Sequence, residues 1–98
     1  MRIANLLKPF QSSRRRRLNI YRHRFTAICP NNGATISYEL RLSTPRTIFV
    51  EDIQAACAEQ ERGYHENIAD SLSRQLGGFQ VLRAIHHGTE ICSWRTGR

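Results

Sequence analysis

The stretch from residue 21 to residue 42 constrains the fold most, because apolar and polar residues alternate on both sides of an Asn-Gly pair. Such alternation is typical of strands with one buried face, and Asn-Gly between two alternating runs is a strong signal for a β-hairpin. We therefore expect a two-residue turn at Asn32-Gly33. In that register three apolar pairs share one face: Cys29 with Ile36, Ala27 with Tyr38, and Phe25 with Leu40.

One face of this hairpin is expected to be covered. The residues predicted there are Phe25, Ala27, Ile36, Tyr38 and Leu40. On the opposite face the same register places Thr26 beside Glu39, and Arg24 beside Arg41. A slip by one residue would mix the apolar and polar faces, so the pattern predicts a half-buried hairpin.

The segment 51–76 has the spacing of helices. Apolar residues recur every three or four positions, Gly63 interrupts the stripe, and the glycine pair at 77–78 is a good helix stop. We expect either two short helices or one kinked helix. The residues predicted to pack on the sheet are Ile53, Cys57, Ile68 and Leu72.

A second pair of strands is expected at 79–86 and 89–94, joined by a turn at His87-Gly88. Both faces of this pair carry apolar residues. Leu82, Ala84 and Ile91 fall on one face, and Val81, Ile85 and Trp94 fall on the other. Because apolar residues on both faces are typical of strands that are covered twice, we expect these strands to be covered on both sides or central in a sheet.

The order of these elements predicts a small single α+β domain. An antiparallel sheet would form from the two hairpins, with the helical segment packed on one face. With 98 residues the chain has room for one core. We expect a basic N-terminal arm over 1–20 and the domain over 21–98. No apolar run approaches the ~18 residues of a membrane span, and no secretory signal is visible, so we expect a cytoplasmic protein without a membrane partner.

The net charge of +7 is unevenly distributed. Residues 1–24 carry eight cations and no carboxylate, whereas residues 25–98 carry seven arginines against eight carboxylates. Such asymmetry indicates a tail that binds a polyanion, or a targeting signal. The basicity of this chain therefore bears on its partners and not on its fold.

The arm and the first strand carry the candidate nucleic-acid-binding residues. They are Arg14, Arg15, Arg16, Arg17, Arg22 and Arg24, with Tyr21 as an aromatic ring for base stacking. Other readings of the arm stay open: a solubilising tail, a mitochondrial presequence, a nuclear targeting signal, or an extension upstream of the true start codon.

The cysteines and histidines offer little for catalysis. Three cysteines at spacings of 28 and 35 residues form no disulfide framework and no Cys-x-x-Cys pair, and we expect Cys29 and Cys57 to be buried. The best catalytic constellation is His86 and His87 at a hairpin tip with Glu90 nearby, but it lacks a nucleophile or metal ligand set. We expect no enzyme, no cofactor and no metal.

The function predicted from the sequence is non-catalytic binding to nucleic acid, DNA or RNA, or to an acidic or nucleoprotein partner, through the arginine-rich arm. The alternative is an accessory protein of the phage or mobile-element type, which binds a host protein machine and inhibits or adapts it. The sequence leaves the oligomeric state open.

Overall fold

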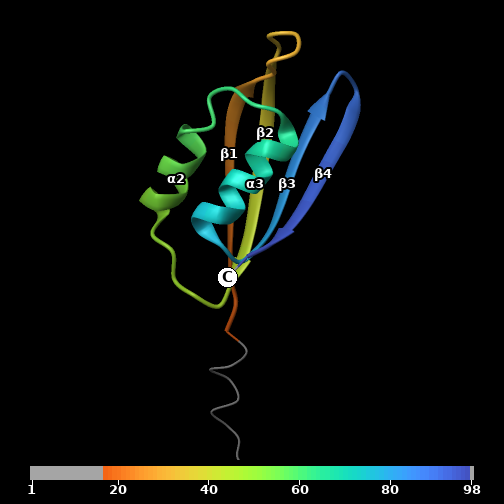
Figure 1. Cartoon of the computed structure of the whole chain (residues 1–98). Helices are drawn as coiled ribbons and strands as arrows, with labels where there is room; N and C mark the ends of the chain where they lie inside the picture. The colour runs from red at the N-terminus through yellow and green to blue at the C-terminus, as the bar shows by residue number, and fades with distance from the viewer. Residues whose placement is uncertain (1–16, 98) are drawn as a thin grey trace, which may run out of the picture.

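Four antiparallel strands and two helices make up residues 17–97, the part of the chain that this computed structural model describes (Figure 1). The strands are β1 (Asn19–Ile28), β2 (Thr35–Thr44), β3 (Phe79–His86) and β4 (Thr89–Thr96). The helices are α2 (Val50–Ala58) and α3 (His65–Leu76), both between β2 and β3. Each strand pairs with its chain neighbour in the sheet order β1-β2-β3-β4. The predicted α+β fold is confirmed.

Both helices lie on the same side of the sheet, which we call the covered face (Figure 1). The sheet contributes a layer of buried apolar side chains to the core: Ala27, Ile36, Tyr38, Leu40, Leu42, Leu82 and Ala84. The helices contribute the facing layer: Ile53, Ala56, Cys57, Ile68, Ala69, Leu72 and Leu76. The predicted covered residues of the first hairpin are confirmed, with Phe25 half-buried and stacked on the ring of Tyr38 at 5.2 Å. The four helical residues predicted to pack on the sheet are all buried.

The first hairpin keeps the predicted faces, but the predicted register is wrong by two residues. Ala27 lies opposite Ile36, and residues 30–33 form the loop. The Cys29 N–H donates to the Ala34 carbonyl at 2.8 Å, and the Asn32 side chain accepts the Ala34 N–H at 3.0 Å. Pairing on the β1 side therefore ends at Cys29, two residues before Asn31, the residue that would flank an Asn-Gly turn. Because side chains alternate with period two, the shift leaves both faces unchanged.

The helical segment is divided in two. After α2, the connection pairs with the end of β1: the Ile28 N–H donates to the Glu61 carbonyl at 2.9 Å, and the Gly63 N–H donates to the Ile28 carbonyl at 3.1 Å. This pairing interrupts the helix at the predicted position. Gly78, after α3, has a positive φ of 73°, and a Cβ there would lie 2.7 Å from Leu42 Cδ1. Only glycine fits this turn into β3.

The second hairpin turns at His87-Gly88 as predicted, with positive φ at both residues. Of the two alternatives expected for its strands, a central place in the sheet holds for β3, whereas β4 is an edge strand. Neither strand is covered on both sides by the described residues. Ile85 and Trp94 are 56% and 68% exposed, on the side of the sheet away from the helices. Both helices come from one connection and pack on one face, so within residues 17–97 nothing covers the other. We call that side the open face.

Leu72 tests the packing of α3 on the sheet. Its side chain is fully buried, so we expect Leu72→Ala to lower the free energy of unfolding by about 2–5 kcal/mol in a urea titration. Leu18→Ala removes the same atoms from an exposed site and should change stability by less than about 0.5 kcal/mol. An equal loss of unfolding free energy in the two variants would contradict the placement of Leu72 in the core.

The three thiols test burial independently. Cys29 and Cys57 are buried and Cys92 is exposed. Burial raises the pKa of Cys57 to about 11, so its reactive thiolate is scarce at neutral pH. A chromogenic disulfide reagent should titrate Cys92 alone rapidly in the native protein, and all three thiols after denaturation. Rapid reaction of a second thiol in the folded state would be incompatible with this arrangement.

Candidate nucleic-acid interface

The open face is organised in rows that run across the four strands. The first row, at the end where β1 begins, holds Ile20, Ser43, Phe79 and Thr96. The second row holds Arg22, Arg41, Val81 and Trp94, and the third holds Arg24, Glu39, Arg83 and Cys92. Each row combines residues from all four strands, so its composition depends on the register of every pairing.

The second row contains two arginines directly opposite each other. Arg22 and Arg41 are cross-strand partners, and both side chains are exposed. Like charges in this position destabilise a sheet. Within residues 17–97 neither arginine forms an ion pair with a carboxylate. The pair is therefore an uncompensated positive site.

The third row has the opposite character, because its two arginines are balanced by Glu39 within the row and by the neighbouring Glu90. Arg24 and Arg83 each lie 3.9 Å from a carboxylate oxygen of Glu39. Arg83 also forms a close charge-assisted hydrogen bond with Glu90, which raises the pKa of its guanidinium. A shallow hollow of about 390 Å³ lies over this part of the face. The positive charge that is available to a ligand is therefore concentrated in the second row.

An aromatic pair occupies the β3–β4 side of the open face. The rings of Phe79 and Trp94 meet edge to face, with centroids 6.2 Å apart and planes at 75°. This geometry suits two aromatic quadrupoles. Trp94 belongs to the same row as Arg22 and Arg41. A cationic site and a stacking surface thus share one line across the sheet.

The predicted site residues have different locations. Arg22 and Arg24 are exposed on the open face, Arg17 is exposed two residues before β1, and Arg14, Arg15 and Arg16 lie outside the described residues. Their binding role stays a prediction. The chain enters β1 beside the first row, so the described part of the arm leads to the aromatic end of the face.

Tyr21 is not brought together with these arginines. Its side chain points to the covered face, where it packs against the core and its hydroxyl accepts a hydrogen bond from the Ile48 N–H at 3.0 Å. Its stacking role is untested, but Trp94 is better placed for it. Sequence reasoning missed Arg41, Phe79 and Trp94 as site residues. The available signal is the presence of apolar residues on both faces of β3 and β4, which is equally typical of strands that are covered twice or central in a sheet.

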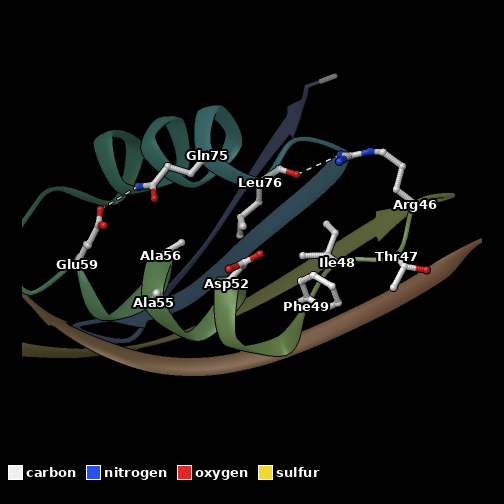
Figure 2. A pocket seen from close by; sticks show the side chains of 10 residues that line it. All are labelled: Arg46, Thr47, Ile48, Phe49, Asp52, Ala55, Ala56, Glu59, Gln75 and Leu76. Carbon is white, nitrogen blue, oxygen red and sulfur yellow. Dashed lines mark hydrogen bonds between the residues drawn. The ribbon is translucent and has the colours of Figure 1, made fainter.

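The covered side has a hollow of about 460 Å³ between the β2–α2 connection, α2 and the end of α3 (Figure 2). Two carboxylates, Asp52 and Glu59, line it with one arginine, Arg46. Arg46 donates to the Leu76 carbonyl at 3.2 Å, and Gln75 donates to Glu59 at 3.2 Å (Figure 2). The excess of carboxylate disfavours phosphate here.

A second hollow, of about 560 Å³, lies at the start of α3 and includes His65 and His86. His65 Nε2 lies 3.1 Å from the Leu82 carbonyl, so this nitrogen carries the proton and donates it. Nδ1 is buried without a partner in the described chain. Burial lowers the pKa of His65, which favours the neutral imidazole.

The predicted His86, His87 and Glu90 constellation is not assembled. The two imidazoles stack with centroids 4.4 Å apart, and Asn32 donates to His87 Nε2 at 2.9 Å. Glu90 instead lies on the open face with Arg83. In the part of the chain that the structure covers, no three His, Cys, Asp or Glu side chains are grouped as metal ligands.

The sequence matches no protein-family model and no curated protein. Among solved structures, the fold is similar to that of the archaeosine synthase QueF-Like in the apo form, with a TM-score of 0.68. The match covers 83% of this chain and 94% of that one at 15% sequence identity. At this identity the likeness establishes the fold alone. No helix among the described residues is long and apolar enough to cross a membrane.

The half-buried His65 predicts a stability change below pH 6.5. Its pKa is lowered in the folded state, so between 6.5 and that lower value the unfolded chain binds more protons. The free energy of unfolding should therefore fall as the pH is lowered through this range. His65→Gln keeps a donor for the Leu82 carbonyl but cannot titrate, and should reduce the slope in urea titrations. His87→Asn, at an exposed turn, is the matched substitution; an unchanged slope in His65→Gln would refute the assignment.

Proposed function

We propose that this protein binds nucleic acid without catalysing a reaction on it, through the arginines of its arm and of its open face. The observation that carries the proposal is the opposed pair Arg22 and Arg41, which has no carboxylate partner within residues 17–97. Guanidinium groups bind phosphate in a bidentate manner and stay charged at all physiological pH values.

The surroundings of this pair support a nucleic-acid ligand over a small anion. Trp94 and Phe79 place exposed aromatic surface in the adjoining positions, and nucleic acids combine phosphates with flat bases. The arm adds a run of four arginines, residues 14–17, directly before β1. Together these features provide phosphate contacts for affinity and an aromatic surface for bases.

The non-catalytic part of the proposal rests on how the polar groups of the open face are used. Glu39 and Glu90 form ion pairs with arginines, so their charge is committed to holding side chains in place. The neutral His65 lies on the covered side of the sheet, away from the arginine pair. A general base is useful only within hydrogen-bond reach of its substrate.

Salt dependence tests the proposal directly. If Arg14–Arg17, Arg22 and Arg24 all contact phosphates, a plot of log K against log salt concentration should have a slope of roughly −4 to −5. Replacing Arg14, Arg15, Arg16 and Arg17 with Ala should flatten the slope by about three units. Fluorescence anisotropy with labelled duplex DNA, single strands and structured RNA measures both slopes.

The variant's circular dichroism and unfolding midpoint serve as controls for an intact fold. Wild-type protein that shows no salt-dependent binding to any of these ligands would overturn the proposal. If the quadruple variant binds with the same affinity and the same salt slope as the wild type, the arm has no part in binding.

A further inference from the structure

We propose that the open face is a binding site for single-stranded nucleic acid, with an unpaired base stacked on Trp94 and phosphates on Arg22 and Arg41. The inference deepens the proposed function and rests on it. It assigns a ligand class, unpaired strands, and a binding surface that the arginine-rich arm alone does not define.

Arg22, Arg41, Val81 and Trp94 are aligned across the four strands. Neighbouring strands lie about 4.8 Å apart, so the row from Arg22 on β1 to Trp94 on β4 spans about 14 Å. That is the length of about four stacked nucleotides at ~3.4 Å each. Val81 lies between Arg41 and Trp94 and offers an apolar contact to a nucleic-acid strand that crosses the row. One short strand can thus contact the arginine pair and the indole together.

Trp94 is 68% exposed, and Phe79 is the one aromatic ring among residues 17–97 that contacts it. Stacking on it requires a base whose π-face is free, and in a duplex both faces of an internal base are occupied. A broad sheet face also does not fit into a major groove, which admits a helix or a two-stranded ribbon. Both points favour unpaired bases over duplex.

The other occupant of an exposed apolar face would be a second copy of the chain. A twofold contact through the open face would place the same patch on both sides. The uncompensated arginines of one copy would then approach those of the other. The carboxylates of this face are already committed, Glu39 to Arg24 and Arg83, and Glu90 to Arg83. Charge complementarity therefore favours a polyanion.

The test uses a built-in probe, because Trp94 is the chain's only tryptophan. Titration of the full-length protein with a 12-nucleotide oligothymidylate should quench its fluorescence, whereas a duplex of the same length should quench it less. Trp94→Leu should weaken single-strand binding about fivefold to 150-fold, the range for losing one stacked base, and Trp94→Phe should restore part of it. Phe49→Leu alters an aromatic residue that is 70% exposed away from the open face and should leave binding unchanged.

A charge-matched pair of variants tests the arginines. Arg41→Gln should weaken binding of the oligothymidylate and reduce its salt slope by about 0.7. Arg74→Gln removes one charge from α3, on the covered side. It should change the affinity and the salt slope less than Arg41→Gln does. Equal effects of the two variants would show that only net charge matters, and would overturn the assignment of the arginine pair.

Cys92 provides a footprint that needs no mutation. It is the exposed thiol, and it lies on the open face two residues from Trp94. Bound oligothymidylate should slow its alkylation. Salt-dependent binding with unchanged Trp94 fluorescence and unchanged Cys92 reactivity would refute this inference and leave the proposed function standing. If the wild-type protein shows no salt-dependent binding at all, both this inference and the proposed function are refuted. Self-association of the free protein that Trp94→Leu abolishes would instead identify a second copy as the occupant.

Discussion

The packing of both helices against a single face of the sheet is the constraint on which the rest of this structure depends. Leu40 and Leu42 from β2, Leu82 from β3 and Leu72 from α3 are among its fully buried side chains. Because α2 and α3 come from the one connection between β2 and β3, they bury the side chains on the covered face of the sheet. The side chains on the open face stay exposed. The open face is thus a consequence of the topology, and its composition is free to serve a ligand.

The sequence predicts the elements of this fold because their signals are local. Alternation fixes which residues face the core, and the glycines at 63 and 77–78 divide and end the helices. The register of the first hairpin could not be obtained in this way. An Asn-Gly turn and a longer loop bring the same faces together. The bonds that hold the longer loop, from the Cys29 N–H to the Ala34 carbonyl and from the Ala34 N–H to the Asn32 side chain, are a property of the folded loop.

That two-residue difference decides the electrostatics of the candidate site. In the predicted register Arg24 lies opposite Arg41; in the observed one Arg22 does, and Arg24 meets Glu39. The position of Trp94 relative to the arginines depends in addition on the pairings of β3 with β2 and β4. Periodicity identifies the face of each residue, but the juxtaposition of four strands is a tertiary property. This is why Arg22 and Arg24 were predicted and Arg41, Phe79 and Trp94 were not.

The contrast between adjacent rows is the strongest physical reason to regard the open face as functional. The third row pairs Arg24 and Arg83 with Glu39, the arrangement that stabilises a sheet surface by itself. The second row places Arg22 against Arg41, which destabilises the sheet in the absence of a ligand. In the proposed complex a phosphate between the two guanidinium groups would offset their repulsion, so ligand binding and folding stability would be linked. The row that is unfavourable in the free protein would thus gain most from an anionic ligand, and it is the row that also holds the exposed indole.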